Sequence, residues 1–167
     1  SGIAFISIAT FQKVHSTGIN VDLYLAKFNV NGARQWATYY GGIGPEQSCF
    51  NGIKTDGLGN VYLAGGTFGS GSSNLYTPGA HKTAITGAFD GILVKFNPAG
   101  KRMWGTYYGG GDNDYINGIA TDESYNVYLV GTTYSNSGIA SGGYQNTFIT
   151  GAGGPEMFLT KFDSSGV

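Results

Sequence analysis

Few residues of this 167-residue chain have the types and spacing that could do chemistry. The sharpest candidate is Asp112-Asn113-Asp114, which follows three glycines. Two carboxylates and an amide on a glycine loop could bind Ca²⁺ together with carbonyl and water oxygens. The EF-hand pattern is absent, because Ile116 and Asn117 occupy the positions of a ligand and of the glycine. The same residues could instead cap a turn that enters a strand, and the sequence favours that interpretation.

Neither the acids nor the histidines indicate catalysis. A glycosidase needs two facing carboxylates, but most acids recur at matching positions of a repeat, which favours a role in every copy. Asp114 and Glu123 have no counterpart in this alignment, and His15 and His81 lie far apart without a nucleophile motif or a set of metal ligands. The recurring sets are Asp22, Asp90 and Glu156, then Asp56 and Asp122, and then Glu46 and Asp112. We therefore expect no enzymatic activity and no cofactor, unless calcium binds at Asp112 and Asp114.

The composition is that of a β-rich chain rather than a helical or disordered one. Thirty glycines and 14% aromatic residues accompany only 11% charged residues, which suits short strands joined by glycine-rich turns. No stretch repeats apolar residues with the helical period. The net charge of −1 offers nothing to neutralise a phosphate backbone, so nucleic acid is not an expected partner. No apolar run approaches the ~18 residues of a membrane-spanning helix.

Two pairs of strands recur along the chain, about every 67 residues. The first pair is joined by a tight turn such as 97–100, in which Pro fixes φ and Gly accepts a positive φ. Its second strand carries Trp-x-Thr-Tyr-Tyr and ends at two glycines. The predicted strands of the first pair are 23–28 with 35–40, 92–96 with 103–108, and 157–162. Those of the second pair are 50–55 with 61–65 and 116–121 with 127–131.

Each unit thus contains four antiparallel strands, apolar on both faces, so each sheet must be covered on both sides. Radial stacking of four-stranded blades satisfies this requirement, and the predicted fold class is an all-β β-propeller. The chain would be one partial propeller of about two and a half blades, with units at approximately 1–68, 69–136 and an incomplete 137–167. Propellers have ~4–8 blades. We therefore expect a fragment of a longer protein or, as the alternative, several chains that complete one ring.

With these residues in view, the repeat resembles the SBBP family of β-propeller repeats. The resemblance rests on the segments 56–65, 78–82, 90–96 and 104–110 and covers nearly the whole chain. Glu123-Ser124-Tyr125 and His81 depart from the family pattern, which has a glycine-containing turn and an aromatic residue at these places. The resemblance implies a propeller in a secreted or surface protein of bacteria, often of the Bacteroidetes type. It implies no reaction, because the family shares no catalytic motif.

Function in such a fold is expected on variable loops above a rigid scaffold. The short turns would lie on one rim of the propeller, and the long connections and acid-bearing loops on the other. The residues of the long-loop rim predicted to contact a ligand are Tyr76, Asp112, Asn113, Asp114, Tyr134 and Tyr144. The repeated residues predicted to be structural are Trp36, Trp104, Lys27, Lys95, Lys161, Asp56 and Asp122. We expect the tryptophans to pack between blades and the lysines to pair with acids or carbonyls of a neighbouring blade.

The first hypothesis for function is a non-enzymatic binding or scaffold segment of a secreted or cell-surface bacterial protein, for example an adhesin. Its long-loop rim would contact protein or glycan, and its other partners would be further blades of a parent chain or other copies of itself. The second hypothesis is a propeller lectin with one shallow carbohydrate site in each blade. The third is a fragment of a larger propeller enzyme whose catalytic residues lie elsewhere.

Overall fold

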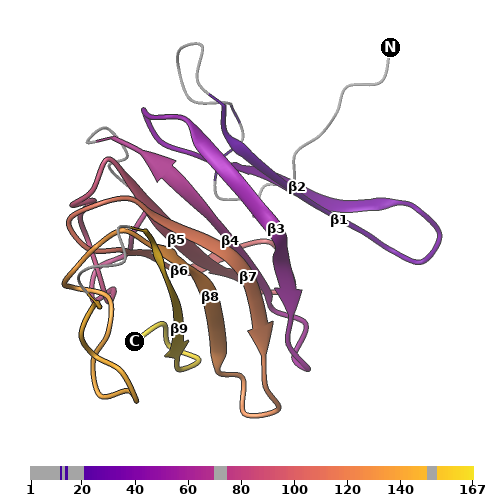
Figure 1. Ribbon diagram of the computed structural model, residues 1–167. Helices are drawn as coiled ribbons and strands as arrows, with labels where there is room; N and C mark the ends of the chain where they lie inside the picture. Colours follow the sequence, from indigo (N-terminus) through magenta and orange to yellow (C-terminus); the bar gives the residue numbers. More distant parts are fainter. Residues whose placement is uncertain (1–11, 13, 15–20, 70–74, 150–153) are drawn as a thin grey trace.

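The computed structural model describes residues 12, 14, 21–69, 75–149 and 154–167, which form nine strands and their connections (Figure 1). Sheet 1 contains β1 (Leu23–Phe28) and β2 (Arg34–Tyr40). Sheet 2 contains β3 (Glu46–Thr55), β4 (Val61–Phe68), β5 (Phe89–Phe96) and β6 (Arg102–Tyr108). Sheet 3 contains β7 (Asp114–Thr121), β8 (Val127–Thr133) and β9 (Glu156–Phe162). All strand pairs in the described part of the chain are antiparallel, and none of the described residues is helical. This confirms the predicted all-β antiparallel organisation.

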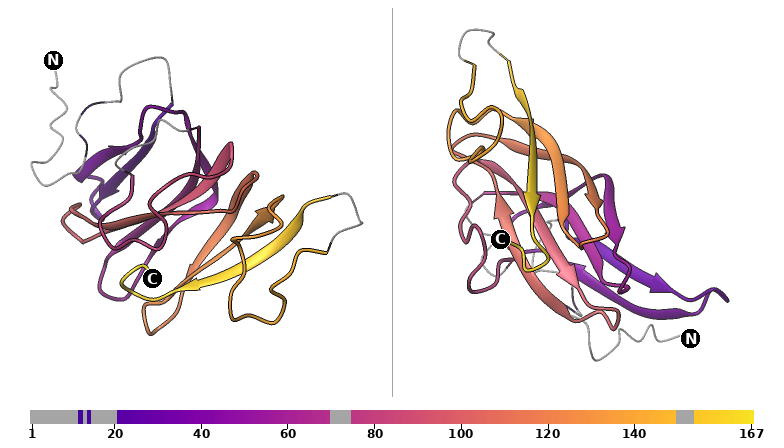
Figure 2. Two further views of the ribbon diagram at one scale, coloured as in Figure 1. Left: turned by 90° about the vertical axis from the view of Figure 1, so that its left-hand side faces the viewer. Right: turned by 90° about the horizontal axis from the view of Figure 1, so that it is seen from below.

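The strands of each sheet are neighbours in sequence order, and sheet 2 lies between the other two (Figure 2). Two strands begin before the predicted positions 50 and 116, because Glu46 pairs with Thr67 and Asp114 pairs with Thr133. The ladders therefore continue to the ends of β4 and β8. Since consecutive strands are antiparallel, the short turns lie at one end of every sheet and the long connections at the other.

Two hydrophobic cores hold the three sheets together, one on each face of sheet 2. Ile92 and Val94 enter the core against sheet 1, whereas Leu93 enters the core against sheet 3. All three side chains are completely buried. This explains why Ile92, Leu93 and Val94 are apolar without a polar residue among them, since a strand buried on both faces has no solvent side.

The repeated Trp and Lys side chains connect each sheet to a turn of the next. Trp36 Nε1 and Lys27 Nζ both donate hydrogen bonds to the carbonyl oxygen of Pro98, at 3.0 and 3.3 Å. Trp104 Nε1 and Lys95 Nζ donate to the same place in the following turn, the carbonyl oxygen of Ser164, at distances of 3.1 Å each. If β3 to β6 are taken as the first to fourth strands of a unit, the turn that follows the third strand is thus bound by two side chains of the unit before it.

The second tyrosine of each Tyr-Tyr pair connects its sheet to the following long connection. The hydroxyl of Tyr40 donates to the carbonyl oxygen of Leu75, and the hydroxyl of Tyr108 donates to that of Ile139. Both tyrosines are buried in the cores. The aromatic residues of β2 and β6 therefore serve packing between sheets.

The turn after the first strand of a unit is organised by its aspartate. The carboxylate of Asp56 accepts hydrogen bonds from the backbone and side-chain nitrogens of Asn60, at 2.9 and 2.8 Å, and from the hydroxyl of Tyr62 at 3.1 Å. The equivalent contacts in the β7–β8 turn are made by Asp122, Asn126 and Tyr128. The repeated Asp, Asn and Tyr form one structural unit because a single carboxylate has enough lone pairs to accept all these donors.

Candidate functional site

The structure brings together four of the six residues predicted to contact a ligand. Tyr134 N donates to the carbonyl oxygen of Asn113 at 3.0 Å, and Asp112 N donates to the hydroxyl of Ser135 at 2.8 Å. The short 109–113 segment and the start of the long 134–155 connection therefore lie side by side, next to Asp114.

The other two predicted contact residues lie apart from this group. Tyr76 is half-buried and packs on the core between sheets 1 and 2, with its ring centroid 6.1 Å from that of Tyr107. Tyr144 is fully exposed in the long connection of sheet 3. The six residues do not form one continuous site.

Asp114 is not the loop residue that the glycine-rich context predicted. It is the first residue of β7, is 1% exposed, and its Oδ2 accepts hydrogen bonds from Gly110 N at 2.6 Å and Ser135 Oγ at 2.9 Å. Burial raises its pKa, and the negative charge of Asp90 adds to this effect. A strand position explains the burial, because the residue faces the adjoining sheet rather than solvent.

The sequence alignment that matched Glu46 with Asp112 is wrong. Glu46 corresponds to Asp114, which therefore does have a counterpart. Glu46 pairs with Thr67, and Asp114 pairs with the equivalent Thr133. The bulge in β3 contains more extra residues than the bulge in β7. A sequence alignment that keeps one offset through both bulges therefore pairs the wrong residues on the N-terminal side of them. Asp114 thus recurs as an acid of the repeat and is not an isolated functional residue.

Acids of adjoining sheets approach each other at this end of the molecule. Asp90 is completely buried, and its Oδ2 lies 2.8 Å from Lys82 Nζ. Lys82 also donates to the carbonyl oxygen of Gly109 and, at 2.6 Å, to the hydroxyl of Thr86. The ammonium group therefore neutralises the carboxylate of Asp90. It also binds the hydroxyl oxygen of Thr86 and the carbonyl oxygen of Gly109, which lie between the two sheets. In the part of the chain that the structure describes, no three His, Cys, Asp or Glu side chains are grouped so that they could bind a metal.

The long connections are fixed by a contact that recurs in all three units. A Gln or Lys side chain of the connection bonds to the acid at the start of the third strand of its unit. The pairs are Gln12 with Asp22 at 3.2 Å, Lys82 with Asp90 at 2.8 Å, and Gln145 with Glu156 at 3.3 Å. The recurrence of Gln, Lys and Gln at these places was visible in the sequence, but their acid partners are defined only by the fold.

A cleft of about 380 Å³ lies between sheets 2 and 3, at the end with the long connections. We call it the aromatic cleft. Phe89 and Tyr115 stack with ring centroids 4.6 Å apart, and Tyr134 meets Tyr115 edge-on at 6.4 Å. Exposed Gln47 and Asn117 contribute amides, and no charged side chain lines the cleft. An uncharged cleft with aromatic rings and amides suits a neutral polar ligand that has an apolar face.

Of the rings in this cleft, sequence reasoning selected Tyr134, as a contact residue of the long-loop rim, but missed Phe89 and Tyr115. Phe89 begins β5 three residues before the apolar run that predicted this strand. Tyr115 precedes the predicted start of β7, and its position beside Phe89 depends on how sheets 2 and 3 pack. Only the three-dimensional arrangement brings these rings together.

His81, which stands where the family pattern has an aromatic residue, packs as one. Its ring meets Phe162 edge-on at 5.4 Å and lies 5.9 Å from Tyr108. Burial lowers its pKa, and the positive charge of Lys82 adds to this effect. The imidazole thus takes the place of an aromatic ring between sheets 2 and 3.

Antiparallel sheets that pack face to face in sequence order, with the same inter-sheet contacts at each junction, define a protein of repeated β-sheet units. Residues 104–139 match the family model described as SBBP, β-propeller repeat, which confirms the resemblance predicted from the motifs. The match runs from Trp104 across β7 and β8 into the long connection of sheet 3.

A viral protein is also similar to this chain. It is an uncharacterized WD repeat-containing protein, L264, of Acanthamoeba polyphaga mimivirus. The two are 27% identical over 130 residues, which cover 66% of this chain and 9% of that protein. The chain therefore spans a small part of the length of this relative. Among the described residues there is no helix of the length and apolarity needed to cross a membrane.

Proposed function

We propose that this chain is a non-enzymatic scaffold and binding segment of a larger β-propeller, in which the three sheets are blades. Its contact surface for protein or glycan is the end with the long connections, beside Tyr134. The parent protein is secreted or attached to a bacterial cell surface, as the family resemblance implies.

The observation that carries this proposal is that the repeated residues bond to neighbouring sheets, whereas the aromatic cleft at the long-connection end is open. The repeated Trp and Lys residues of β1, β2, β5 and β6 and the second tyrosine of each Tyr-Tyr pair have partners in the next sheet or its connections. The aromatic cleft, by contrast, is formed by residues outside this repeated set. Residues that recur and bond internally support a scaffold, whereas an open cleft whose stacked rings, Phe89 and Tyr115, have no aromatic counterpart in the other units supports binding.

The aromatic cleft also favours a second candidate, a lectin. A pyranose ring presents an apolar face to an aromatic ring and hydroxyls to amides, and the cleft offers both without a charge. A glycan array tests this candidate with the unaltered chain, Tyr134→Ala and Tyr144→Ala. Tyr144 is the matched control, because it is fully exposed and lies outside the cleft. The lectin candidate requires glycan binding that Tyr134→Ala abolishes and Tyr144→Ala keeps.

The wider proposal of a contact surface at one end is tested by site-specific photo-crosslinking in the parent protein. A photoreactive phenylalanine analogue replaces Tyr134 at the long-connection end and, in a matched variant, Leu58 in an exposed short turn at the opposite end. We expect crosslinks to a partner from position 134 and none from position 58. Equal crosslinking from both positions, or crosslinking from position 58 alone, would contradict the proposal.

A further inference from the structure

In sheet 2 the fourth strand is held on both sides. One edge of β6 pairs with β5, and the other meets the long connection: Tyr107 N donates to the carbonyl oxygen of Lys82 at 3.1 Å, and Lys82 N donates to the hydroxyl of Thr106 at 2.9 Å. Sheet 1 repeats both contacts at β2, where Tyr39 N donates to Gln12 O at 3.1 Å and Gln12 N donates to Thr38 Oγ1 at 3.0 Å. The Thr-Tyr of each fourth strand therefore binds the Gln or Lys of the connection.

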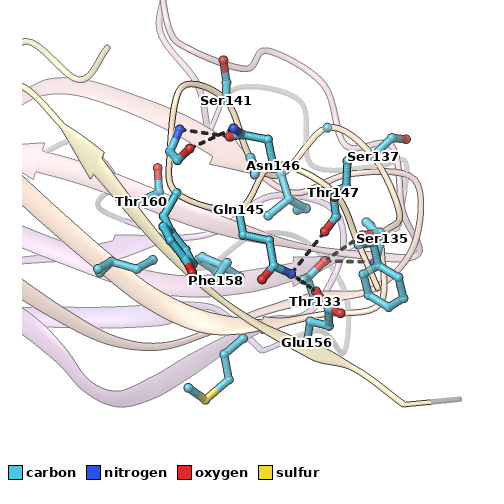
Figure 3. A pocket seen from close by; sticks show the side chains of 18 of the residues that line it. Thr133, Ser135, Ser137, Ser141, Gln145, Asn146, Thr147, Glu156, Phe158 and Thr160 are labelled. Atoms are coloured by element: carbon cyan, nitrogen blue, oxygen red, sulfur yellow. Dashed lines mark hydrogen bonds between the residues drawn. The ribbon is translucent and has the colours of Figure 1, made fainter. Parts of the chain in front are cut away.

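Sheet 3 has the same connection but, in the described part of the chain, no fourth strand beside β9. The connection is nevertheless held in place by Glu156, whose carboxylate accepts hydrogen bonds from Gln145 Nε2 at 3.3 Å and Ile149 N at 2.7 Å. A groove of about 600 Å³ separates residues 137–148 from β9. Figure 3 shows Gln145 next to Glu156, with Phe158 and Thr160 among the other residues that line the groove.

The turn after β9 already directs the chain back along this groove. Asp163 N donates to the carbonyl oxygen of Val167 at 2.9 Å, and Gly166 N donates to that of Asp163 at 3.1 Å. The same two bonds join Asn97 to Lys101 and Gly100 to Asn97 in the β5–β6 hairpin. Because Val167 corresponds to Lys101, residues that follow it would run antiparallel to β9.

We propose that this groove binds an extended Trp-x-Thr-Tyr-Tyr segment, supplied by the parent polypeptide beyond the 163–167 turn. The register follows from the pairs Lys95 with Trp104 and Leu93 with Thr106 in sheet 2. The tryptophan of the segment lies opposite Lys161, its threonine opposite Leu159, and its first tyrosine opposite Phe158. The threonine hydroxyl accepts from Gln145 N, and the first tyrosine N donates to Gln145 O. This assignment rests on the proposed larger propeller, but not on what the long-connection end binds.

The test extends the chain. The ten residues of 101–110, which form β6 and its flanks, are placed after the 163–166 turn and replace Val167. A matched extension carries the same ten residues in scrambled order, and a third replaces the first tyrosine of Tyr-Tyr by proline, which removes the N–H that would donate to Gln145. Thermal unfolding and hydrogen exchange of the β9 amides are measured. We expect the ordered extension to raise Tm by at least about 5 °C over the scrambled one and to protect β9, and the proline version to lose most of both effects.

Equal Tm values and equal β9 exchange for the ordered and scrambled extensions would overturn the proposal. A second measurement adds the synthetic 101–110 peptide, labelled with fluorescein, to the unextended chain. Saturable one-to-one binding that the scrambled peptide does not show would support the assignment. A chain that is already dimeric by light scattering, with β9 amides protected before peptide is added, would show that a second copy occupies the groove, and would equally overturn the proposal.

Discussion

Asp90 of sheet 2 and Asp114 of sheet 3 face each other across Gly109. Asp90 Oδ1 and Asp114 Oδ2 lie 2.7 and 2.8 Å from the position that a Cβ on Gly109 would occupy. Sheet 1 repeats this relationship at Gly41, where a Cβ would collide with Asp22 and, at 2.6 Å, with Glu46 Oε2. The first glycine of the repeated Gly-Gly is thus required by the approach of two carboxylates, and not only by the end of a strand.

Gly109→Ala should therefore destabilise the protein. The added methyl group would displace buried carboxylates, and overpacking of this kind costs roughly 1–3 kcal/mol. Chemical denaturation measures the change in the free energy of unfolding. Gly111→Ala is the matched control, because a Cβ at that position has no neighbour within 4 Å, and its effect should be below about 0.5 kcal/mol. Equal losses for the two variants would contradict this explanation of the Gly-Gly motif.

The buried carboxyl of Asp114 should make stability depend on pH. Burial raises its pKa above the ordinary value of 3.8, so the folded state binds this proton more tightly than the unfolded state. The resulting stabilisation is present below pH 3.8 and is lost as the pH rises through the folded-state pKa. Asp114→Asn removes this dependence, so the stability of the variant relative to the unaltered chain should increase between about pH 4 and pH 7.

Denaturation curves across this pH range provide the measurement. Asp112→Asn is the control, because Asp112 is exposed and its side chain makes no hydrogen bond in the described structure. Its stability relative to the unaltered chain should change little over the same range. A difference for Asp114→Asn that stays constant with pH would show that this carboxyl titrates normally in the folded protein.

The strand pairs could be predicted from the sequence because their patterns are local. Residues 92–94 are apolar on both faces of the strand, and the turn 97–100 has its characteristic Asn, Pro and Gly, so β5 and its hairpin could be predicted without other parts of the chain. The beginnings of β3 and β7 could not be predicted in the same way. Glu46 and Asp114 are polar and follow glycine-rich segments, and they belong to strands only because Thr67 and Thr133 lie opposite them.

The candidate site was only partly predictable for a similar reason. Tyr134 could be found as an aromatic residue in a variable loop, but its neighbours Tyr115 and Phe89 belong to different sheets. The distance between such residues is fixed by packing between sheets, which leaves no local pattern in the sequence. Tyr76 illustrates the opposite error, since a loop aromatic that looked available packs on a core instead.

The shared carbonyl acceptors between sheets should make paired substitutions non-additive. Trp104→Phe removes the bond from Nε1 to Ser164 O, and Lys95→Met removes the second bond to the same oxygen. Each single change leaves one donor in place and should cost about 0.5–1.5 kcal/mol. The double variant leaves neither side-chain donor, so its loss should exceed the sum of the single losses. A double-mutant cycle by chemical denaturation measures this coupling, and strict additivity would show that the two donors act independently.

The same turn position in two units should respond to substitution with opposite sign. Gly59 has φ +78°, and the equivalent Tyr125 has φ 65°, a left-handed conformation that costs a non-glycine residue roughly 1 kcal/mol. Gly59→Ala should therefore lower the free energy of unfolding by about 1 kcal/mol, whereas Tyr125→Gly should raise Tm because it relieves that strain. Gly57→Ala is the control in the first turn, because a Cβ there would make only an ordinary contact at 3.7 Å and Gly57 does not have a positive φ. A loss of stability in Tyr125→Gly would show that the tyrosine ring contributes more by contact than its backbone loses by strain.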